Sequence, residues 1–202
     1  MFDINEFTRF YLAIFYSSVA AFYTLRILLM KQANSQEFVF SGKRFCKTWL
    51  NHTTFRLFRV AIWMVCVLRL FFPTTDSYLG MIESLNKPPI IVLGLVLLSL
   101  GFLSTILIHF HLGKHWRSGI DPSGPKHLIT TGIFQYSRNP MYIFVAIAQL
   151  GFFFALPSLF TLVCLGIGLY TLDSQAREEE KHLFDKFLES YEQYAAKVNR
   201  WI

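Results

Sequence analysis

The feature that most constrains this chain is a series of apolar segments of membrane-spanning length. The clearest is residues 90–110, IIVLGLVLLSLGFLSTILIHF, which contains no Asp, Glu, Lys or Arg. Residues 10–30 form a second segment, and residues 57–72 form a shorter one that holds Arg59 and Arg69. A helix needs about 20 apolar residues to cross the core of a bilayer. The chain is therefore expected to be a small polytopic membrane protein.

A fourth apolar run, residues 141–172, is too long to be one span. As a single helix its 32 residues would extend roughly 48 Å at about 1.5 Å per residue, against a hydrocarbon core of about 30 Å. Pro157 lies in its middle and removes a backbone donor. We predict two short helices, 141–156 and 158–172, joined by a tight turn. A single kinked helix is the alternative.

The distribution of Lys and Arg tests this arrangement. Segments 31–56, 112–140 and 173–202 together contain 14 of them, whereas the remaining connections hold only Arg9 and Lys87. Positive residues concentrate on the cytoplasmic side of membrane proteins. The asymmetry predicts five spans, with the N-terminus outside and the C-terminus in the cytoplasm. The net charge of +6 is then a consequence of topology, and no nucleic-acid partner is needed.

Composition excludes several other classes. The chain is 53% hydrophobic and 16% charged, which is incompatible with disorder or a collagen-like fibre. Its three cysteines are odd in number and widely spaced, so they form no disulfide framework. His109, His111 and His115 suggest a metal site such as that of membrane di-iron hydroxylases and desaturases. Those enzymes use more histidines than the six present in this chain. We expect no metal.

The first segment with chemical potential is residues 127–142, HLITTGIFQYSRNPMY, which leads into the fourth predicted span. Pro140 suits the first turn of a helix, whose N-terminus offers free N–H groups to an anion. Arg138 adds a planar, permanently charged group that matches a carboxylate. The alternative is that Arg138 and Tyr142 merely anchor a helix at the membrane interface.

The second is residues 173–183, DSQAREEEKHL, directly after the fifth predicted span. Three adjacent carboxylates, residues 178–180, are costly at a membrane exit unless they are solvated or paired, and Arg138 and Arg177 are the expected partners. The alternative is a solvated first turn of a helix. Residues 183–198 then show the periodicity of an amphipathic helix, which would lie on the membrane or close over a site.

Together the two segments resemble the superfamily of isoprenylcysteine carboxyl methyltransferases and phospholipid methyltransferases. The first signature of that superfamily is matched by His127-Leu128-Ile129, Gly132, Phe134, Arg138-Asn139-Pro140 and Tyr142. The second is matched by Glu179-Glu180, Leu183, Phe187, Tyr191, Tyr194, Val198 and Arg200. The resemblance covers about residues 115–202. The first three predicted spans carry no signature.

The resemblance implies an all-α integral-membrane methyltransferase that uses S-adenosylmethionine at the cytoplasmic face, of the type found in prokaryotic inner membranes. Residues 1–110 would supply three helices and a basic cytoplasmic loop, and residues 111–202 the cofactor-binding core. Arg138, Glu179 and Glu180 would be catalytic. The expected cofactor-binding residues are His127, Leu128, Gly132, Tyr136, Arg138, Asn139, Pro140, Tyr142, Glu179 and Glu180.

Three positions depart from the family pattern. Asn139 stands where many eukaryotic members have His, which fits a prokaryotic-type enzyme and removes an imidazole base. Phe134 replaces a common Tyr, and Leu188 replaces the usual Gly. Because glycine permits a bend that leucine resists, Leu188 predicts a continuous helix at this point.

The acceptor is left open: a prenylcysteine-type carboxylate, a phospholipid amine or a thiol all suit a membrane-embedded site. We expect the acceptor to be lipophilic and to enter from the bilayer between the third span and the following helix pair, while the oligomeric state is not determined. Two other functions compete. One is a non-catalytic protein that binds membrane lipid or assists assembly, and the other is a reductase similar to the sterol reductases, which use NADPH.

Overall fold

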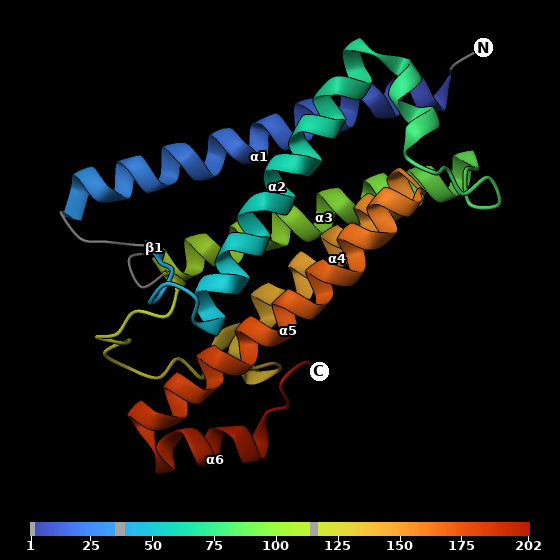
Figure 1. The fold of residues 1–202 in the computed structure, drawn as a ribbon. Helices are drawn as coiled ribbons and strands as arrows, with labels where there is room; N and C mark the ends of the chain where they lie inside the picture. Colours follow the sequence, from blue (N-terminus) through green and yellow to red (C-terminus); the bar gives the residue numbers. More distant parts are fainter. Residues whose placement is uncertain (1–2, 35–38, 114–116) are drawn as a thin grey trace.

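The computed structural model describes residues 3–34, 39–113 and 117–202, and it confirms the all-helical class (Figure 1). In chain order the elements are α1 (Ile4–Asn34), β1 (Val39–Phe40), α2 (Lys47–Phe71), η1 (Pro73–Tyr78), α3 (Pro88–Leu112), β2 (Ser118–Gly119), η3 (Gly132–Gln135), α4 (Pro140–Ala155), α5 (Leu159–Phe187) and α6 (Glu189–Lys197). Helices account for nearly all regular structure in these ranges.

Three of the described helices are long and apolar enough to cross a membrane. They comprise Ile4–Leu29, Pro88–Leu112 and Leu159–Phe187, whereas α4 is apolar but shorter and α2, which contains three arginines, is not among them. Large apolar side chains such as Leu29, Leu57 and Leu107 point outward and are exposed. A bilayer would cover such faces, which would be a liability in water.

The long apolar run is divided into two helices, as predicted. Helix α4 ends at Ala155 and α5 begins at Leu159. Ser158 caps α5 in a reciprocal arrangement, in which the Thr161 N–H donates to Ser158 Oγ and the Ser158 N–H donates to Thr161 Oγ1, both at 3.2 Å. This capping box satisfies donors that the helix start leaves without partners.

Helix α5 does not end at residue 172 as the sequence analysis expected. It continues to Phe187, so that the three glutamates lie within the helix and not after it. Nothing in residues 173–187 interrupts a helix, since they contain neither Pro nor Gly and are rich in good helix formers. The apolar run therefore indicated where the apolar part of the helix ends, and the helix itself extends beyond it.

The predicted continuity at Leu188 is wrong. Leu188 adopts φ 45° and ψ −118°, which ends α5 and lets α6 turn back beneath it (Figure 1). Leucine rarely adopts a positive φ because its Cβ clashes with the backbone. The bend that glycine provides in the family pattern is thus kept here at the cost of local strain.

Helices α3 and α4 pack with their backbones in contact. A Cβ atom on Gly94 would lie 2.2 Å from the backbone N of Ala155, and one on Gly151 would lie 2.2 Å from the backbone N of Leu98. One on Gly101 would lie 2.7 Å from the N of Ala148. Only glycine fits such a seam, which is a common way for membrane helices to associate. The seam closes α3 against α4.

The connections gather at two ends of the bundle. At the end that carries α6, β1 pairs in parallel with β2, with Val39 opposite Ser118 and Phe40 opposite Gly119. At the other end, the Leu159 N–H donates to Gly80 O and the Ile82 N–H to Pro157 O, each at 2.9 Å. We call these the cavity end and the distal end. The two basic loops that sequence analysis assigned to one membrane face meet at the cavity end.

Candidate functional site

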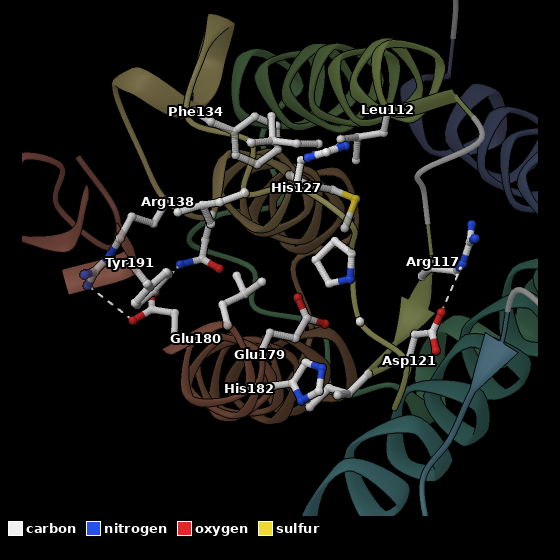
Figure 2. Close-up of a pocket in the computed structure, with 18 of the residues that line it drawn as sticks. Leu112, Arg117, Asp121, His127, Phe134, Arg138, Glu179, Glu180, His182 and Tyr191 are labelled. Atoms are coloured by element: carbon white, nitrogen blue, oxygen red, sulfur yellow. Dashed lines mark hydrogen bonds and ion pairs between the residues drawn. The ribbon is translucent and has the colours of Figure 1, made fainter. Parts of the chain in front are cut away.

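A cavity of about 830 Å³ lies at the cavity end (Figure 2). Its wall combines the loop of residues 117–129, the residues that open α4, the segment of α5 around Glu179 and Glu180, and two tyrosines of α6. The two signature segments, about 40 residues apart in the chain, therefore face the same space. The helix α5 carries its glutamates back to the start of α4 because the two helices are joined by the short turn after Ala155.

Eight of the ten residues that the resemblance singled out line this cavity. They are His127, Leu128, Arg138, Asn139, Pro140, Tyr142, Glu179 and Glu180. The other two do not line it. Tyr136 is 72% exposed, and Gly132 opens η3 with a φ of 65°, which is a conformation that glycine adopts without strain. Gly132 thus has a structural reason to be glycine.

Glu180 is the hub of the polar contacts. Its carboxylate lies 3.2 Å from Arg138 Nη2 and accepts hydrogen bonds from Arg200 Nε and Nη2 at 3.0 and 3.1 Å. Asn139 Nδ2 donates to Glu180 Oε1 at 2.6 Å. The residue is only 8% exposed, and two guanidinium groups surround one carboxylate. The group therefore carries an excess positive charge at the N-terminus of α4, which itself favours anions.

Arg138 was expected to pair with the glutamates, and it does; Arg177 was expected to do so as well, and it does not. Arg177 Nε instead binds Asp173 Oδ2 at 2.7 Å, one turn earlier on the same helix. Glu178 points elsewhere and forms an ion pair of 3.2 Å with Lys47. Of the three glutamates, only the second and third face the cavity.

Asn139 is placed at the N-cap of α4 but does not cap it. Its side chain makes no capping hydrogen bond, although asparagine is among the best N-cap residues. The amide is instead used on Glu180, and it also lies 3.3 Å from the carbonyl oxygen of Arg200. A local rule of helix stability is broken at the site, as is common for functional residues.

The C-terminal tail is hydrogen-bonded to the residues that lead into α4. The Arg138 N–H donates to Asn199 O at 3.0 Å, and Ser137 Oγ donates to Arg200 O at 3.1 Å. The hydrogen bonds to Glu180 raise the pKa of the Arg200 guanidinium above its ordinary value, so this side chain stays charged. Arg200 was missed as a site residue. Its place in the second signature was the signal that could have identified it.

Glu179 has different surroundings. Tyr142 Oη donates to Glu179 Oε1 at 2.6 Å and Gln175 Nε2 donates to the same oxygen at 3.0 Å. Gln175 is in turn held by Asn51 Nδ2 of α2, at 3.3 Å. No hydrogen bond reaches Oε2 of Glu179 from any described residue. Gln175 was also missed; its position one helical turn before Glu179 was the available signal.

Three buried polar atoms of the cavity wall have no hydrogen-bond partner among the described residues. They are Arg138 Nε, His182 Nε2 and Tyr191 Oη. Burial raises the pKa of Tyr191 to about 12, so its hydroxyl is a neutral donor at physiological pH. Buried polar groups in proteins nearly always have partners, and exceptions commonly mark ligand sites. The cavity thus offers unused hydrogen-bonding groups and positive charge to a polar, anionic ligand.

The histidines considered for a metal site do not assemble in the described part of the chain. No group of three or more His, Cys, Asp or Glu residues there could hold a metal ion. His109 Nε2 lies 3.1 Å from Met141 Sδ. His115 lies outside the described residues.

Comparison with known proteins gives one match. Residues 89–190, just over half of the chain, match the family model for phospholipid methyltransferases, whereas no curated protein and no solved structure matches. The match confirms the resemblance predicted from the signature residues, and it includes α3, for which those residues gave no indication. Together with the three apolar helices it indicates an integral membrane protein. The chain belongs to the phospholipid methyltransferase family.

Proposed function

We propose that this protein transfers a methyl group from S-adenosylmethionine to a lipophilic acceptor at the cytoplasmic membrane face. The observation that carries the proposal is the convergence of both family signatures on one cavity whose wall holds unused buried donors. Enzymes of this family generally use S-adenosylmethionine, and the cavity has the polar, cationic character that its amino-acid end requires.

The residues present fit this cofactor. Arg138 Nε has no hydrogen-bond partner in the described part of the chain, and the residue lies beside the N-terminus of α4, which suits a carboxylate. The apolar stretches of the wall, from Leu128 and Phe134, can contact a flat ring. When bound, S-adenosylmethionine supplies a methyl group attached to a positively charged sulfur. Glu180 holds Arg138 in place and compensates its charge.

The two glutamates are assigned different roles. Glu180 is engaged by Arg138, Arg200 and Asn139, so it is a counter-ion that positions Arg138. Glu179 lines the cavity, and one of its oxygens receives no hydrogen bond from the described residues. It can accept a proton from an amine acceptor, as a general base. A carboxylate acceptor would need no such help, and positioning with exclusion of water would suffice.

The proposal includes five membrane crossings with the cavity end in the cytoplasm. The pairing of β1 with β2 supports it, because it brings two basic connections to the same end of the bundle as α6. Helix α4, with 16 residues, would extend about 24 Å, short of the core of about 30 Å. Helix α4 packs against the longer helix α3 with their backbones in contact. This packing supports a crossing by a helix that is shorter than the hydrocarbon core.

The test is transfer of tritiated methyl groups from S-adenosylmethionine by the purified protein. Two acceptors would be offered in separate reactions: phosphatidylethanolamine in vesicles, and a farnesylcysteine analogue. We expect one to be labelled, and Glu179→Gln to reduce labelling of the amine by about 100-fold or more. Glu178→Gln is the matched control, since this neighbour faces Lys47 and not the cavity. The proposal would be contradicted if Glu179→Gln and Glu178→Gln lost the same amount of labelling. It would also be contradicted if the folded wild-type protein labelled neither acceptor.

A further inference from the structure

A second hollow, of about 380 Å³, lies in the apolar part of the bundle between α4 and α5. We call it the α4–α5 groove. Its wall includes Ala146 and Leu150 of α4, Leu165 and Leu169 of α5, and Trp201 of the C-terminal tail. Nearly the whole wall is hydrocarbon, so that the groove offers a polar molecule nothing to bind.

Tyr142 joins the groove to the cavity of the candidate site. It belongs to the wall of both hollows, and its hydroxyl donates to Glu179 Oε1 at 2.6 Å. A chain lying in the groove would therefore end next to the glutamate that we assign to the acceptor. The groove continues the candidate site and is not a separate surface feature.

The length of the groove suits one leaflet of a bilayer. From Tyr142 to Leu150 is eight residues of α4, or about 12 Å at 1.5 Å per residue. Half of the hydrocarbon core is about 15 Å. The groove is thus nearly as long as one leaflet of the hydrocarbon core is deep.

The route expected from the sequence, between α3 and the helix pair that follows, is obstructed along the face where α3 meets α4. Backbone atoms of α3 and α4 are in contact along the seam formed by Gly94, Gly101 and Gly151. No chain can pass there without separating the helices. The α4–α5 groove lies on the other side of α4 and reaches Tyr142 directly.

We propose that the α4–α5 groove binds the hydrocarbon chain of the methyl acceptor, with the acceptor's polar end at Tyr142. The inference rests on the proposed function. The same tail that supplies Arg200 to Glu180 also places Trp201 and Ile202 in the wall of the groove. Binding of the acceptor chain and the geometry of the charged cluster are therefore linked through three consecutive residues.

Trp201 provides a direct probe of occupancy. A protein in which Trp49, Trp63 and Trp116 are replaced by Phe would retain only this tryptophan. Its fluorescence would be measured in nanodiscs that contain phosphatidylethanolamine brominated on its acyl chains. Ala146→Phe fills the groove, whereas Val163→Phe adds the same ring at a position of α5 that is already exposed and outside the groove.

We expect bromine quenching of Trp201 to fall at least threefold in Ala146→Phe and to be unchanged in Val163→Phe. Transfer to whichever acceptor the parent protein labels, phosphatidylethanolamine or the farnesylcysteine analogue, should fall about tenfold in Ala146→Phe alone. Equal quenching in both variants would overturn the proposal. So would lost quenching with unchanged transfer, which indicates a resident lipid, or a change of oligomeric state in Ala146→Phe alone, which indicates a second copy in the groove.

Titration with S-adenosylhomocysteine separates failure of this inference from failure of the proposed function. Both variants should bind it as the parent does, because Ala146 and Val163 lie outside the cavity wall. Normal binding with the wrong quenching pattern refutes the groove alone. Absence of binding in the parent protein refutes the proposed function, and the quenching comparison still reports whether the groove holds a chain.

Discussion

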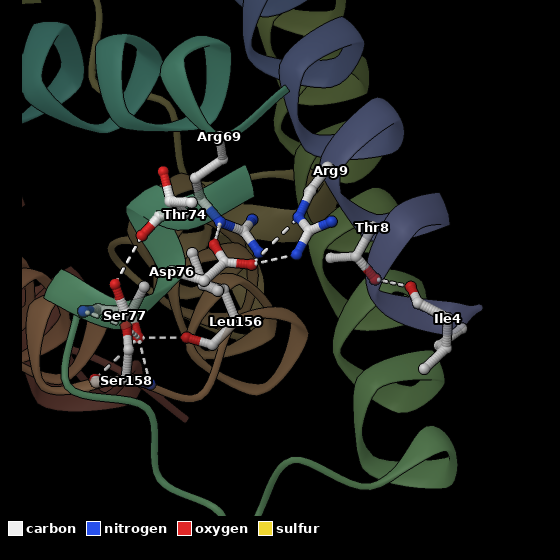
Figure 3. Close-up of polar contacts among 10 residues, drawn as sticks. Ile4, Thr8, Arg9, Arg69, Thr74, Asp76, Ser77, Leu156 and Ser158 are labelled. Atoms are coloured by element: carbon white, nitrogen blue, oxygen red, sulfur yellow. Dashed lines mark hydrogen bonds and ion pairs between the residues drawn. The ribbon is translucent and has the colours of Figure 1, made fainter. Parts of the chain in front are cut away.

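The two ends of the bundle contain the same constellation, one carboxylate between two arginines, in two different settings. At the cavity end Glu180 lies between Arg138 and Arg200. At the distal end Asp76 of η1 lies between Arg9 of α1 and Arg69 of α2 (Figure 3). The comparison shows which features beyond residue type make a charged cluster a candidate site.

The distal cluster fastens helices. Arg9 binds Asp76 Oδ2 through Nη2 at 2.8 Å and Nε at 3.1 Å, and Arg69 Nε lies 2.5 Å from Oδ1. Arg69 is only 1% exposed. One of its nitrogens also has no hydrogen-bond partner within residues 3–34, 39–113 and 117–202, but the cluster does not line either of the two hollows described above. We therefore infer that the distal cluster stabilises the fold and does not bind a ligand.

The cavity cluster differs in having space and several unused donors. Arg138, Tyr191 and His182 each present, in the wall of one cavity, an atom that has no hydrogen-bond partner among the described residues. The arginine–carboxylate clusters alone would suggest two candidate functional sites among the described residues. Only the cluster around Glu180 lines a cavity, so we take it as the candidate site.

The largest effect predicted from this comparison concerns stability at the distal end. Asp76→Ala leaves Arg69 buried without its counter-ion, so we expect the free energy of unfolding to fall by about 3–5 kcal/mol. Thermal unfolding in detergent would measure it. Methyl transfer per folded molecule should be unchanged, and a selective loss of transfer would contradict the assignment.

At the cavity end the order of effects reverses. Glu180→Ala releases Arg138 and Arg200, and the resulting misplacement should lower methyl transfer by about 100-fold. The loss of stability should be smaller than for Asp76→Ala, because water that enters the cavity can solvate Arg138. Transfer assays and thermal unfolding on both variants give the comparison. An equal loss of stability in both would show that the two clusters do not differ as proposed.

The pH dependence of stability tests the distal end by itself. Burial by itself would raise the pKa of Asp76, but hydrogen bonds and charge from Arg69 and Arg9 outweigh it and hold the pKa below 3.8. The stabilisation is therefore complete above pH 3.8 and is lost as the pH falls through the lower folded-state value. Unfolding curves from pH 6 downward should show this loss. Asp76→Asn should abolish it, and an unchanged acid profile in that variant would refute the attribution.

The smallest effect is expected at Leu188. Its positive φ costs a leucine of order 1 kcal/mol, and its side chain is 59% exposed. Leu188→Gly should therefore stabilise the protein slightly, by up to about 1 kcal/mol. Gly124→Ala is the opposite control, because φ there is 64° and a Cβ would meet the Lys186 side chain. Destabilisation by Leu188→Gly would show that the leucine contributes contacts that outweigh the strain.

Local patterns in the sequence predicted much of this structure. Pro157 marked the division of the long apolar run, and the two signatures identified most of the cavity wall. Spacing along the chain was enough in these cases, because a proline acts on its own helix and a signature is contiguous.

What sequence reasoning missed depends on partners distant in the chain. Two such contacts are the hydrogen bonds from Arg200 to Glu180 and from Asn51 to Gln175. They depend on the tertiary arrangement of the chain, which no local pattern specifies. The bend at Leu188 was missed because tertiary contacts of α6, such as the hydrogen bond from Tyr194 to the carbonyl of Phe134 at 2.6 Å, override the preference of leucine. The glycine seam of α3 and α4 likewise became visible only as a contact.

The most direct test is calorimetric titration of the detergent-purified protein with S-adenosylhomocysteine, with Glu180→Ala and Asp76→Ala alongside. We predict saturable binding at one site in the wild type and in Asp76→Ala, and binding weakened by about 100-fold in Glu180→Ala. Absence of binding in folded wild-type protein, or equal binding in Glu180→Ala, would contradict the claim that the cavity around Glu180 holds the cofactor.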